Sequence, residues 1–134
     1  MSRICLDTSA YSHFKRGDAA AVRALDRAKT VIVPAVVLGE LRVGFATGAR
    51  QAKNEGELQL FLAQPAVTTA DIDDEAATLY AELVCDLRLA GTPLPTNDVW
   101  IAAVALREGA TVVTYDEHFQ KIPRVGSNVL ARSS

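Results

Sequence analysis

The chain has 134 residues, of which 49% are hydrophobic and 22% are charged, and its formal net charge is −2. This length suits a single domain, 1–134, and the composition excludes an intrinsically disordered chain. No apolar run reaches the roughly 18 residues of a transmembrane helix, and the N-terminus lacks the basic and apolar regions of an export signal. We therefore expect a cytoplasmic protein with a hydrophobic core and no membrane contact.

Short apolar runs alternate with longer segments of helical periodicity along the whole chain. Runs rich in β-branched residues predict strands, and apolar residues three or four positions apart predict helices. The predicted strands lie at 4–6, 31–33, 66–69, 111–114 and, for a short fifth strand, near 124–125. The predicted helices lie at 8–15, 19–25, from Pro34 to the 44–48 region, 49–62, 71–90 and 98–108.

Several helix starts carry recognisable signals. Asp18 is expected to cap the helix at 19–25, and Pro34 suits the first turn of the helix that it begins. Acidic residues crowd the start of the helix at 71–90, where negative charge complements the helix dipole. We interpret these as helix-starting residues rather than metal ligands: Asp71, Asp73, Asp74 and Glu75.

The alternation of strands and helices predicts an α/β fold. We expect a central parallel sheet of four to five strands flanked by helices in three layers. In such sheets the carboxyl ends of the strands meet at one edge, and ligands bind outside that edge. Residues that directly follow the predicted strands are therefore the first candidates for a functional site.

Four acidic residues, far apart in the sequence, are placed to meet at this edge. Asp7 follows the first strand, Asp116 follows the strand at 111–114, and Glu40 and Asp98 lie on helices. Clustered carboxylates repel one another, so their ionised forms need a compensating cation. Oxygen ligands of this kind suit Mg²⁺ or Mn²⁺.

Three of these residues also have an ordinary structural interpretation. Asp7 could cap the helix at 8–15, although Thr8 and Ser9 could do so equally well. Asp98 could be a first-turn residue that complements the helix dipole, and Asp116 could be an ordinary turn aspartate.

Glu40 is harder to explain as a surface residue. Its neighbours on both sides are apolar, and an unpaired buried carboxylate costs several kcal/mol in rough terms. A metal ion is one possible partner. An ion pair with Arg42 or Arg3 is the alternative.

The acidic residues lie within segments that resemble the motifs of PIN domains. The resemblance spans nearly the whole chain and is greatest to the VapC-like toxins of type II toxin–antitoxin systems. It rests on Leu6-Asp7-Thr8-Ser9, on Glu40, on Thr96-Asn97-Asp98-Val99-Trp100-Ile101-Ala102-Ala103 and on Thr114-Tyr115-Asp116-Glu117-His118-Phe119.

This resemblance implies a small endoribonuclease that depends on Mg²⁺ (or Mn²⁺). The acidic metal-site positions of the family would fall on Asp7, Glu40, Asp98 and Asp116. A metal-bound water would attack an RNA phosphodiester, and no histidine base would be needed. The resemblance also implies a small antitoxin partner, whose tail covers the active-site groove, and a homodimer.

Other residues near these motifs have supporting or ordinary roles. Hydroxyl and amide side chains flank the acidic positions, where they could bind phosphate or orient the carboxylates: Thr8, Ser9, Asn97 and Thr114. Basic residues that could form a positive rim fall in the first part of the chain: Lys15, Arg16, Arg23, Arg27, Arg42, Arg50 and Lys53. We expect His13 and His118 to be surface or packing residues, Trp100 to belong to the core, and Cys5 and Cys85 to be buried, reduced thiols.

Three alternatives compete with a nuclease. A phosphatase of the haloacid-dehalogenase type also has an aspartate after its first strand, but it needs Asp-x-Asp where this chain has Asp7-Thr8-Ser9. A receiver-like binding module would need a lysine near the end of a late strand, and Lys121 is the only late lysine. A degenerate PIN domain that only binds RNA is disfavoured because all four acidic residues are present.

Overall fold

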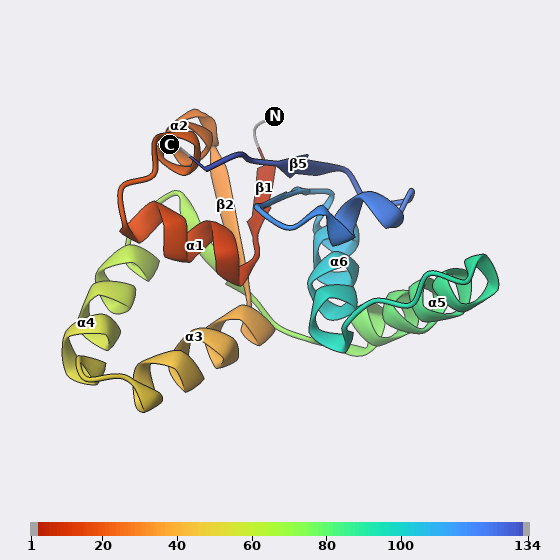
Figure 1. Ribbon diagram of the computed structural model, residues 1–134, viewed down its shortest axis with the longest axis horizontal. Coiled ribbons are helices and arrows are strands. Elements are labelled where there is room, and N and C mark those ends of the chain that lie inside the picture. The colour runs from red at the N-terminus through yellow and green to blue at the C-terminus, as the bar shows by residue number, and fades with distance from the viewer. Residues whose placement is uncertain (1–2, 133–134) are drawn as a thin grey trace.

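A computed structural model describes residues 3–132 and contains one five-stranded sheet, in which every pair of neighbouring strands is parallel (Figure 1). The strand order is β3-β2-β1-β4-β5. The strands are β1 (Arg3–Leu6), β2 (Thr30–Pro34), β3 (Val67–Ala70), β4 (Thr111–Thr114) and β5 (Ser127–Val129). The predicted α/β class is confirmed, while both ends of the expected domain, 1–134, fall outside the described residues.

Helices flank this sheet and extend beyond it. They are α1 (Thr8–Lys15), α2 (Ala19–Arg27), α3 (Ala35–Thr47), α4 (Gln51–Leu62), α5 (Asp74–Ala90), α6 (Thr96–Glu108) and the short 3₁₀ helix η1 (Glu117–Lys121). Helix α6 contacts β1, β2 and β4, and α1 contacts β1 and β4. Figure 1 shows α3 and α4 at one end of the molecule and α5 at the other. Within residues 3–132 no helix is both long and apolar enough to cross a membrane.

The core forms where the sequence is most uniformly apolar. In β2, Val31 is 3% exposed and Ile32 and Val33 are fully buried, as a strand covered on both faces requires. Helix α6 is buried through its middle and packs against both the sheet and α5. Its buried middle residues, which include three small alanines, are Ile101, Ala102, Ala103, Val104 and Ala105.

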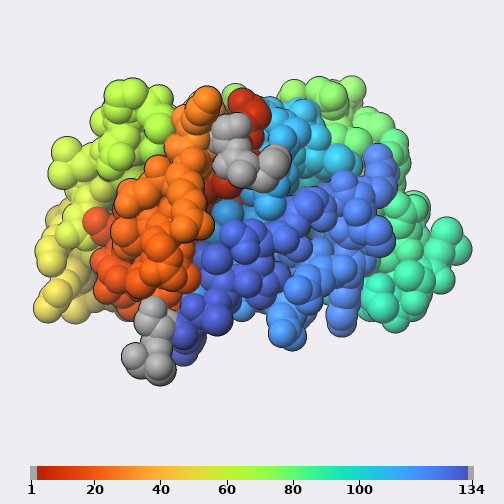
Figure 2. All heavy atoms as spheres, turned by 90° about the horizontal axis from the view of Figure 1, so that it is seen from above, coloured from red at the N-terminus to blue at the C-terminus, as the bar shows by residue number. Residues whose placement is uncertain are grey.

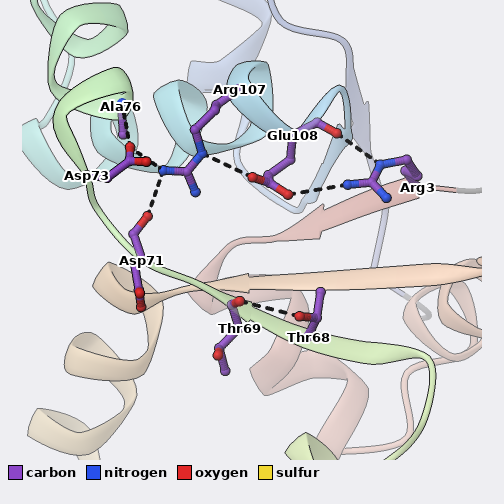
Figure 3. A network of polar contacts seen from close by, with 8 residues as sticks. All are labelled: Arg3, Thr68, Thr69, Asp71, Asp73, Ala76, Arg107 and Glu108. Atoms are coloured by element: carbon purple, nitrogen blue, oxygen red, sulfur yellow. Dashed lines mark hydrogen bonds and ion pairs between the residues drawn. The ribbon is translucent and has the colours of Figure 1, made fainter.

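Helix α5 begins later than the predicted residue 71. Its N-cap is Asp73, whose carboxylate accepts a hydrogen bond from the backbone N–H of Ala76 at 2.9 Å. The Arg107 side chain donates to the carbonyl oxygen of Asp71 and to the carboxylate of Asp73, at 2.8 and 2.7 Å (Figure 3). These bonds join the connection after β3 to α6. Ile72 precedes the N-cap, so it lies outside the helix, and it is 40% exposed.

The last strand also lies later than predicted. The apolar pair at 124–125 suggested a strand, but β5 pairs with β4 through Ser127, Asn128 and Val129. Val125 is buried in the turn that precedes β5, so its apolar character reflects packing rather than strand pairing. Helix η1 was not predicted, because its residues have the polarity of a loop.

Two predicted helix starts differ in detail. Pro34 is the last residue of β2 and the N-cap of α3, rather than a residue of its first turn. Asp18 occupies the N-cap position of α2, but its side chain makes no capping bond. That carboxylate instead accepts a hydrogen bond from the hydroxyl of Tyr115. Burial and this hydrogen bond raise the pKa of Tyr115 to about 12.

Three predictions about burial have mixed outcomes. Cys5 is buried in β1, as expected, and burial raises the pKa of its thiol. Cys85 is exposed on α5, so the prediction of a second buried thiol is wrong. Trp100 is only half-buried, and its ring stacks on Tyr80 of α5 with the centroids 3.8 Å apart. The indole therefore joins α6 to α5 at the margin of the core.

Candidate metal centre

The candidate site lies at the carboxyl ends of the two central strands, β1 and β4. These strands are direct neighbours, with Leu6 opposite Val113. The chain continues from β1 to β2 and β3 on one side, while β4 and β5 lie on the other, so the strand order changes direction here. Such a switch point leaves a crevice in which α/β proteins bind ligands.

Asp7 is the most enclosed of the four acidic residues. It is 5% exposed and caps α1, because its carboxylate accepts a hydrogen bond from the backbone N–H of Ala10 at 2.9 Å. Its oxygens also accept from the hydroxyls of Ser9, at 2.8 Å, and Thr114, at 2.5 Å. Asp7 itself, and not Thr8 or Ser9, therefore provides the cap, while the carboxylate also lies at the crevice.

Burial and hydrogen bonding have opposite effects on the pKa of Asp7. Burial raises the pKa of its carboxyl, and the nearby charge of Asp98 raises it further. The hydrogen bonds from Thr114, Ala10 and Ser9 act in the opposite direction, because they stabilise the ionised form. The net result is a pKa above the ordinary value of 3.8.

Glu40 reaches the site from α3 and is held by neutral donors. Its carboxylate accepts a hydrogen bond from the Thr8 hydroxyl at 2.5 Å and from the Asn97 side-chain amide at 3.1 Å. The proposed ion pairs with Arg42 and Arg3 are wrong, since these arginines bind Glu55 and Glu108. Glu40 is also only partly buried, contrary to what its apolar neighbours suggested.

Asp98 and Asp116 meet a histidine that faces both of them. Nδ1 of His118 lies 3.1 Å from Oδ2 of Asp98 and 3.1 Å from Oδ2 of Asp116. Asp116 also caps η1, because its carboxylate accepts a hydrogen bond from the backbone N–H of His118 at 2.9 Å. His118 is partly exposed, as predicted, but its contacts with two acidic residues were not predicted.

The charges of neighbouring carboxylates affect the ionisation of Asp98 and Asp7. Burial raises the pKa of Asp98, the charges of Asp116 and Glu40 raise it further, and His118 partly opposes these effects. Asp98 in turn raises the pKa of Asp7. The fold thus brings all four predicted acidic residues to one edge of the sheet.

The neutral neighbours connect the acidic residues into one network. Besides donating to Asp7, the Ser9 hydroxyl accepts a hydrogen bond from the backbone N–H of Tyr115 at 3.0 Å. The Thr114 hydroxyl accepts one from the backbone N–H of Asp116 at 2.9 Å. Because these bonds join the ends of β1 and β4 directly, the carboxylates are oriented by the backbone of the sheet edge.

The site has little positive charge of its own. Within residues 3–132, no lysine or arginine forms an ion pair with any of the four carboxylates. One oxygen of Asp98, one of Asp116 and a ring nitrogen of His118 all lie within 4.8 Å of one another. An acidic cluster that no lysine or arginine of the described residues neutralises is chemically suited to a divalent cation.

Comparison with known proteins agrees with this architecture. A family model described as "PIN domain" matches residues 4–125. The chain belongs to the PIN domain family. It is 32% identical over 130 residues to ribonuclease VapC5 of Mycobacterium tuberculosis (strain ATCC 25618 / H37Rv), an alignment that covers 95% of this chain and 93% of that protein.

Solved structures show the same PIN fold. VapBC-5 from Mycobacterium tuberculosis, a member of the VapBC family of toxin–antitoxin systems, has a TM-score of 0.77 and 30% identity, covering 97% of this chain and all of that chain (100%). VapBC2 from Rickettsia felis, bound to a DNA fragment from the promoter, has a TM-score of 0.85 and 24% identity. That match covers 96% of this chain and 98% of the other chain. Membership of the PIN family removes the phosphatase and receiver-like alternatives.

Sequence reasoning about this PIN domain missed one residue of the site, His118. Its motif contained a usable signal: His118 follows Asp116 by two residues, directly after a strand that ends at the crevice. A tight turn at that point brings the two side chains to the same side. The turn itself, η1, was not predicted, and a metal-bound water needs no histidine base, so sequence reasoning did not place the histidine in the site.

Proposed function

We propose that this PIN domain is a metal-dependent endoribonuclease and the toxin of a type II toxin–antitoxin system. The observation that carries the proposal is the group of four carboxylates at the β1–β4 crevice, which hydrogen-bond donors orient and with which, among residues 3–132, no lysine or arginine pairs. The similarity to a VapC ribonuclease and to a VapBC structure supports the same function.

In this proposal Asp7, Glu40, Asp98 and Asp116 hold Mg²⁺ or Mn²⁺. When bound, the metal lowers the pKa of a coordinated water and offsets the charge that develops on the phosphate and leaving oxygens. The protein keeps the carboxylates in place by the hydrogen bonds described above. Donors of this kind that orient metal-binding groups commonly matter about 10- to 100-fold for metal affinity or activity.

Basic residues of α1 and α4 offer a path for the RNA backbone away from the acidic edge. A groove of about 400 Å³ lies between α1, α3 and α4, and its floor includes Tyr11, Leu41 and Phe45. Four of the predicted rim residues line it: Lys15, Arg16, Arg50 and Lys53. Thr8 and Ser9 lie at the other end of α1 from Lys15. Glu57 also lines the groove and pairs with Lys15 at 3.9 Å, so the net positive charge that favours a polyanion comes from the remaining three basic residues.

The remaining rim residues are placed elsewhere. Arg42 pairs with Glu55 at 3.1 Å, so its charge is already balanced. Arg23 and Arg27 line a separate pocket of about 550 Å³ between α2 and the sheet. Helix α2 and the C-terminal strand lie side by side there (Figure 2). The RNA path proposed above therefore involves only the α1–α4 side.

The partners and location follow from the same function. We propose a small cognate antitoxin, a homodimeric toxin and a cytoplasmic location. The support for the antitoxin is that VapBC-5 is described as a member of a family of toxin–antitoxin systems.

The decisive experiment maps new RNA 5′ ends across the transcriptome after induced expression in a bacterial host. Wild type is compared with Asp98→Ala and with the control Asp86→Ala, which removes an exposed carboxylate of α5. We expect new ends and growth arrest with wild type and with Asp86→Ala, but not with Asp98→Ala. Identical profiles for wild type and Asp98→Ala, with soluble protein confirmed, would contradict the proposed nuclease.

A further inference from the structure

His118 is held in a position that packing does not explain. Its side chain is 42% exposed, so it contributes little to the core. Its ring nitrogen Nδ1 nevertheless lies 3.1 Å from carboxylate oxygens of two different elements, α6 and the end of β4. The backbone N–H of His118 is bonded to Asp116 as well, which fixes the residue relative to that carboxylate.

The spacing of the three atoms matches neighbouring ligands of one cation. Ligands at right angles around an octahedral metal with bonds of roughly 2.1–2.2 Å are about 3 Å apart. Nδ1 lies 3.1 Å from each of the two Oδ2 atoms, and the group as a whole spans no more than 4.8 Å. The nitrogen therefore occupies a position that a metal held by Asp98 and Asp116 could share.

Hydrogen bonding alone accounts for this arrangement only as a shared bond. An imidazole carries at most one proton on Nδ1, so that proton would be divided between the two carboxylates in a three-centre bond. With the proton on Nε2, Nδ1 presents a lone pair to the space between the two carboxylates. Neutral imidazole in this form is a common metal ligand.

The second histidine of the chain shows the contrasting case. Nδ1 of His13 lies 2.9 Å from the backbone carbonyl oxygen of Ser9, and its ring stacks on Tyr115 with the centroids 4.0 Å apart. These contacts fully explain His13 as a packing residue. The chain thus supplies its own control for the loss of a histidine near the site.

We propose that His118 is a metal ligand through Nδ1 and that this nitrogen makes the site prefer Mn²⁺ over Mg²⁺. The inference rests on the proposed metal-dependent function. Mg²⁺ is a hard cation that takes oxygen ligands and keeps several waters, whereas transition metals accept imidazole nitrogen more readily. Replacing an oxygen position by nitrogen therefore shifts the balance between the two ions.

The test is electron spin-echo spectroscopy of Mn²⁺ bound to the full chain, together with calorimetric titration of Mn²⁺ and Mg²⁺. Wild type and His13→Ala are expected to show coupling from a coordinated imidazole nitrogen. His118→Ala should still bind Mn²⁺ but lose that coupling, with Mn²⁺ affinity about tenfold lower and Mg²⁺ affinity nearly unchanged. His118→Asn, which offers an oxygen instead, should bind both ions with a reduced preference for Mn²⁺.

Two outcomes would overturn the inference in different ways. Mn²⁺ bound to wild type without nitrogen coupling would exclude His118 as a ligand and leave the nuclease proposal intact. An Mn²⁺ preference retained in His118→Asn would assign His118 a hydrogen-bonding role instead. If wild type binds neither ion while Asp98→Ala behaves identically, the metal-dependent function itself fails.

Discussion

Two groups of charged side chains in this PIN domain are built in opposite ways. Around Arg107, whose side chain is 9% exposed, each carboxylate has a basic partner: Arg107 pairs with Asp73 at 2.7 Å and with Glu108 at 3.0 Å, and Arg3 pairs with Glu108 (Figure 3). At the β1–β4 crevice the carboxylates meet hydroxyls, amides and one histidine.

The pKa values follow this difference. Hydrogen bonds from the backbone of Ala76 and from Arg107 lower the pKa of Asp73. Burial raises the pKa values of Asp7 and Asp98, and neighbouring carboxylates add to that effect. The Arg107 cluster is therefore complete within the chain and structural, whereas the carboxylates at the crevice are oriented by hydrogen bonds and, among the described residues, pair with no lysine or arginine. A bound cation would supply the carboxylates of the crevice with the positive charge that Arg107 supplies to Asp73 and Glu108.

The largest expected effect is the loss of nuclease activity in Asp7→Asn. Asparagine keeps the size of the side chain and an oxygen to cap α1, but it removes a charge that would hold the metal. We expect RNA cleavage by purified protein to fall at least about a hundredfold with little change in fold. Asp86→Ala is the control, and an active Asp7→Asn variant would contradict the assigned role.

The second prediction concerns Arg107→Ala, which breaks the structural cluster. Loss of its bonds to the carbonyl of Asp71 and the carboxylates of Asp73 and Glu108 should lower the melting temperature by about 5 °C, because each carboxylate loses its bond to the guanidinium. Cleavage per folded molecule should stay unchanged. A drop in activity without a drop in melting temperature would show that the two regions are not independent.

The third prediction removes one neutral donor from the crevice. Thr8→Val deletes the hydroxyl that donates to Glu40 while keeping a β-branched side chain. We expect cleavage to fall about tenfold, since Glu40 loses one of its two positioning bonds. Thr47→Val, which removes a hydroxyl that bonds only to carbonyl oxygens of α3, is the matched control and should retain full activity.

The smallest effect is on the pH dependence of stability without metal. The folded-state pKa of Asp98 lies above its ordinary 3.8, so the folded protein favours the protonated carboxyl. The stability contributed by this group is complete below pH 3.8 and is lost as pH rises through the folded-state pKa. Asp98→Asn avoids that loss and should melt about 3 °C higher than wild type at pH 7 in a chelator.

The same pair of proteins provides the control for this prediction. The difference in melting temperature should shrink toward acidic pH, because wild type then also carries a neutral side chain. Adding Mn²⁺ should stabilise wild type more than Asp98→Asn, since binding to the folded state alone raises stability. A wild type that melts higher than Asp98→Asn in chelator would show that Asp98 is already neutralised within the chain.

Much of the fold could be predicted from local patterns. The run 31–33 and the run 111–114 are uniformly β-branched or apolar, and both are buried central strands. The apolar helix after Asp98 is central for the same reason. The convergence of Asp7 and Asp116 followed from the rule that parallel strands end at one edge, which depends on topology and not on detailed packing.

Other features depended on contacts between distant segments. Arg107 binds the carboxylate that caps α5, although it lies 34 residues after Asp73. Pairing with β4, rather than local composition, determines where β5 lies. The two partners of Glu40, Thr8 and Asn97, lie 32 and 57 positions away in the sequence, and His118 lies 20 positions from Asp98.

The division has a physical reason. The spacing of apolar residues within a segment indicates which of its faces is buried, and this spacing can be read from that segment alone. Hydrogen bonds and ion pairs require two atoms within about 3 Å, so they depend on how separate segments are placed in space. The sequence by itself therefore determined the layers of this PIN domain and its acidic edge, and only the tertiary structure decided which donors hold each carboxylate.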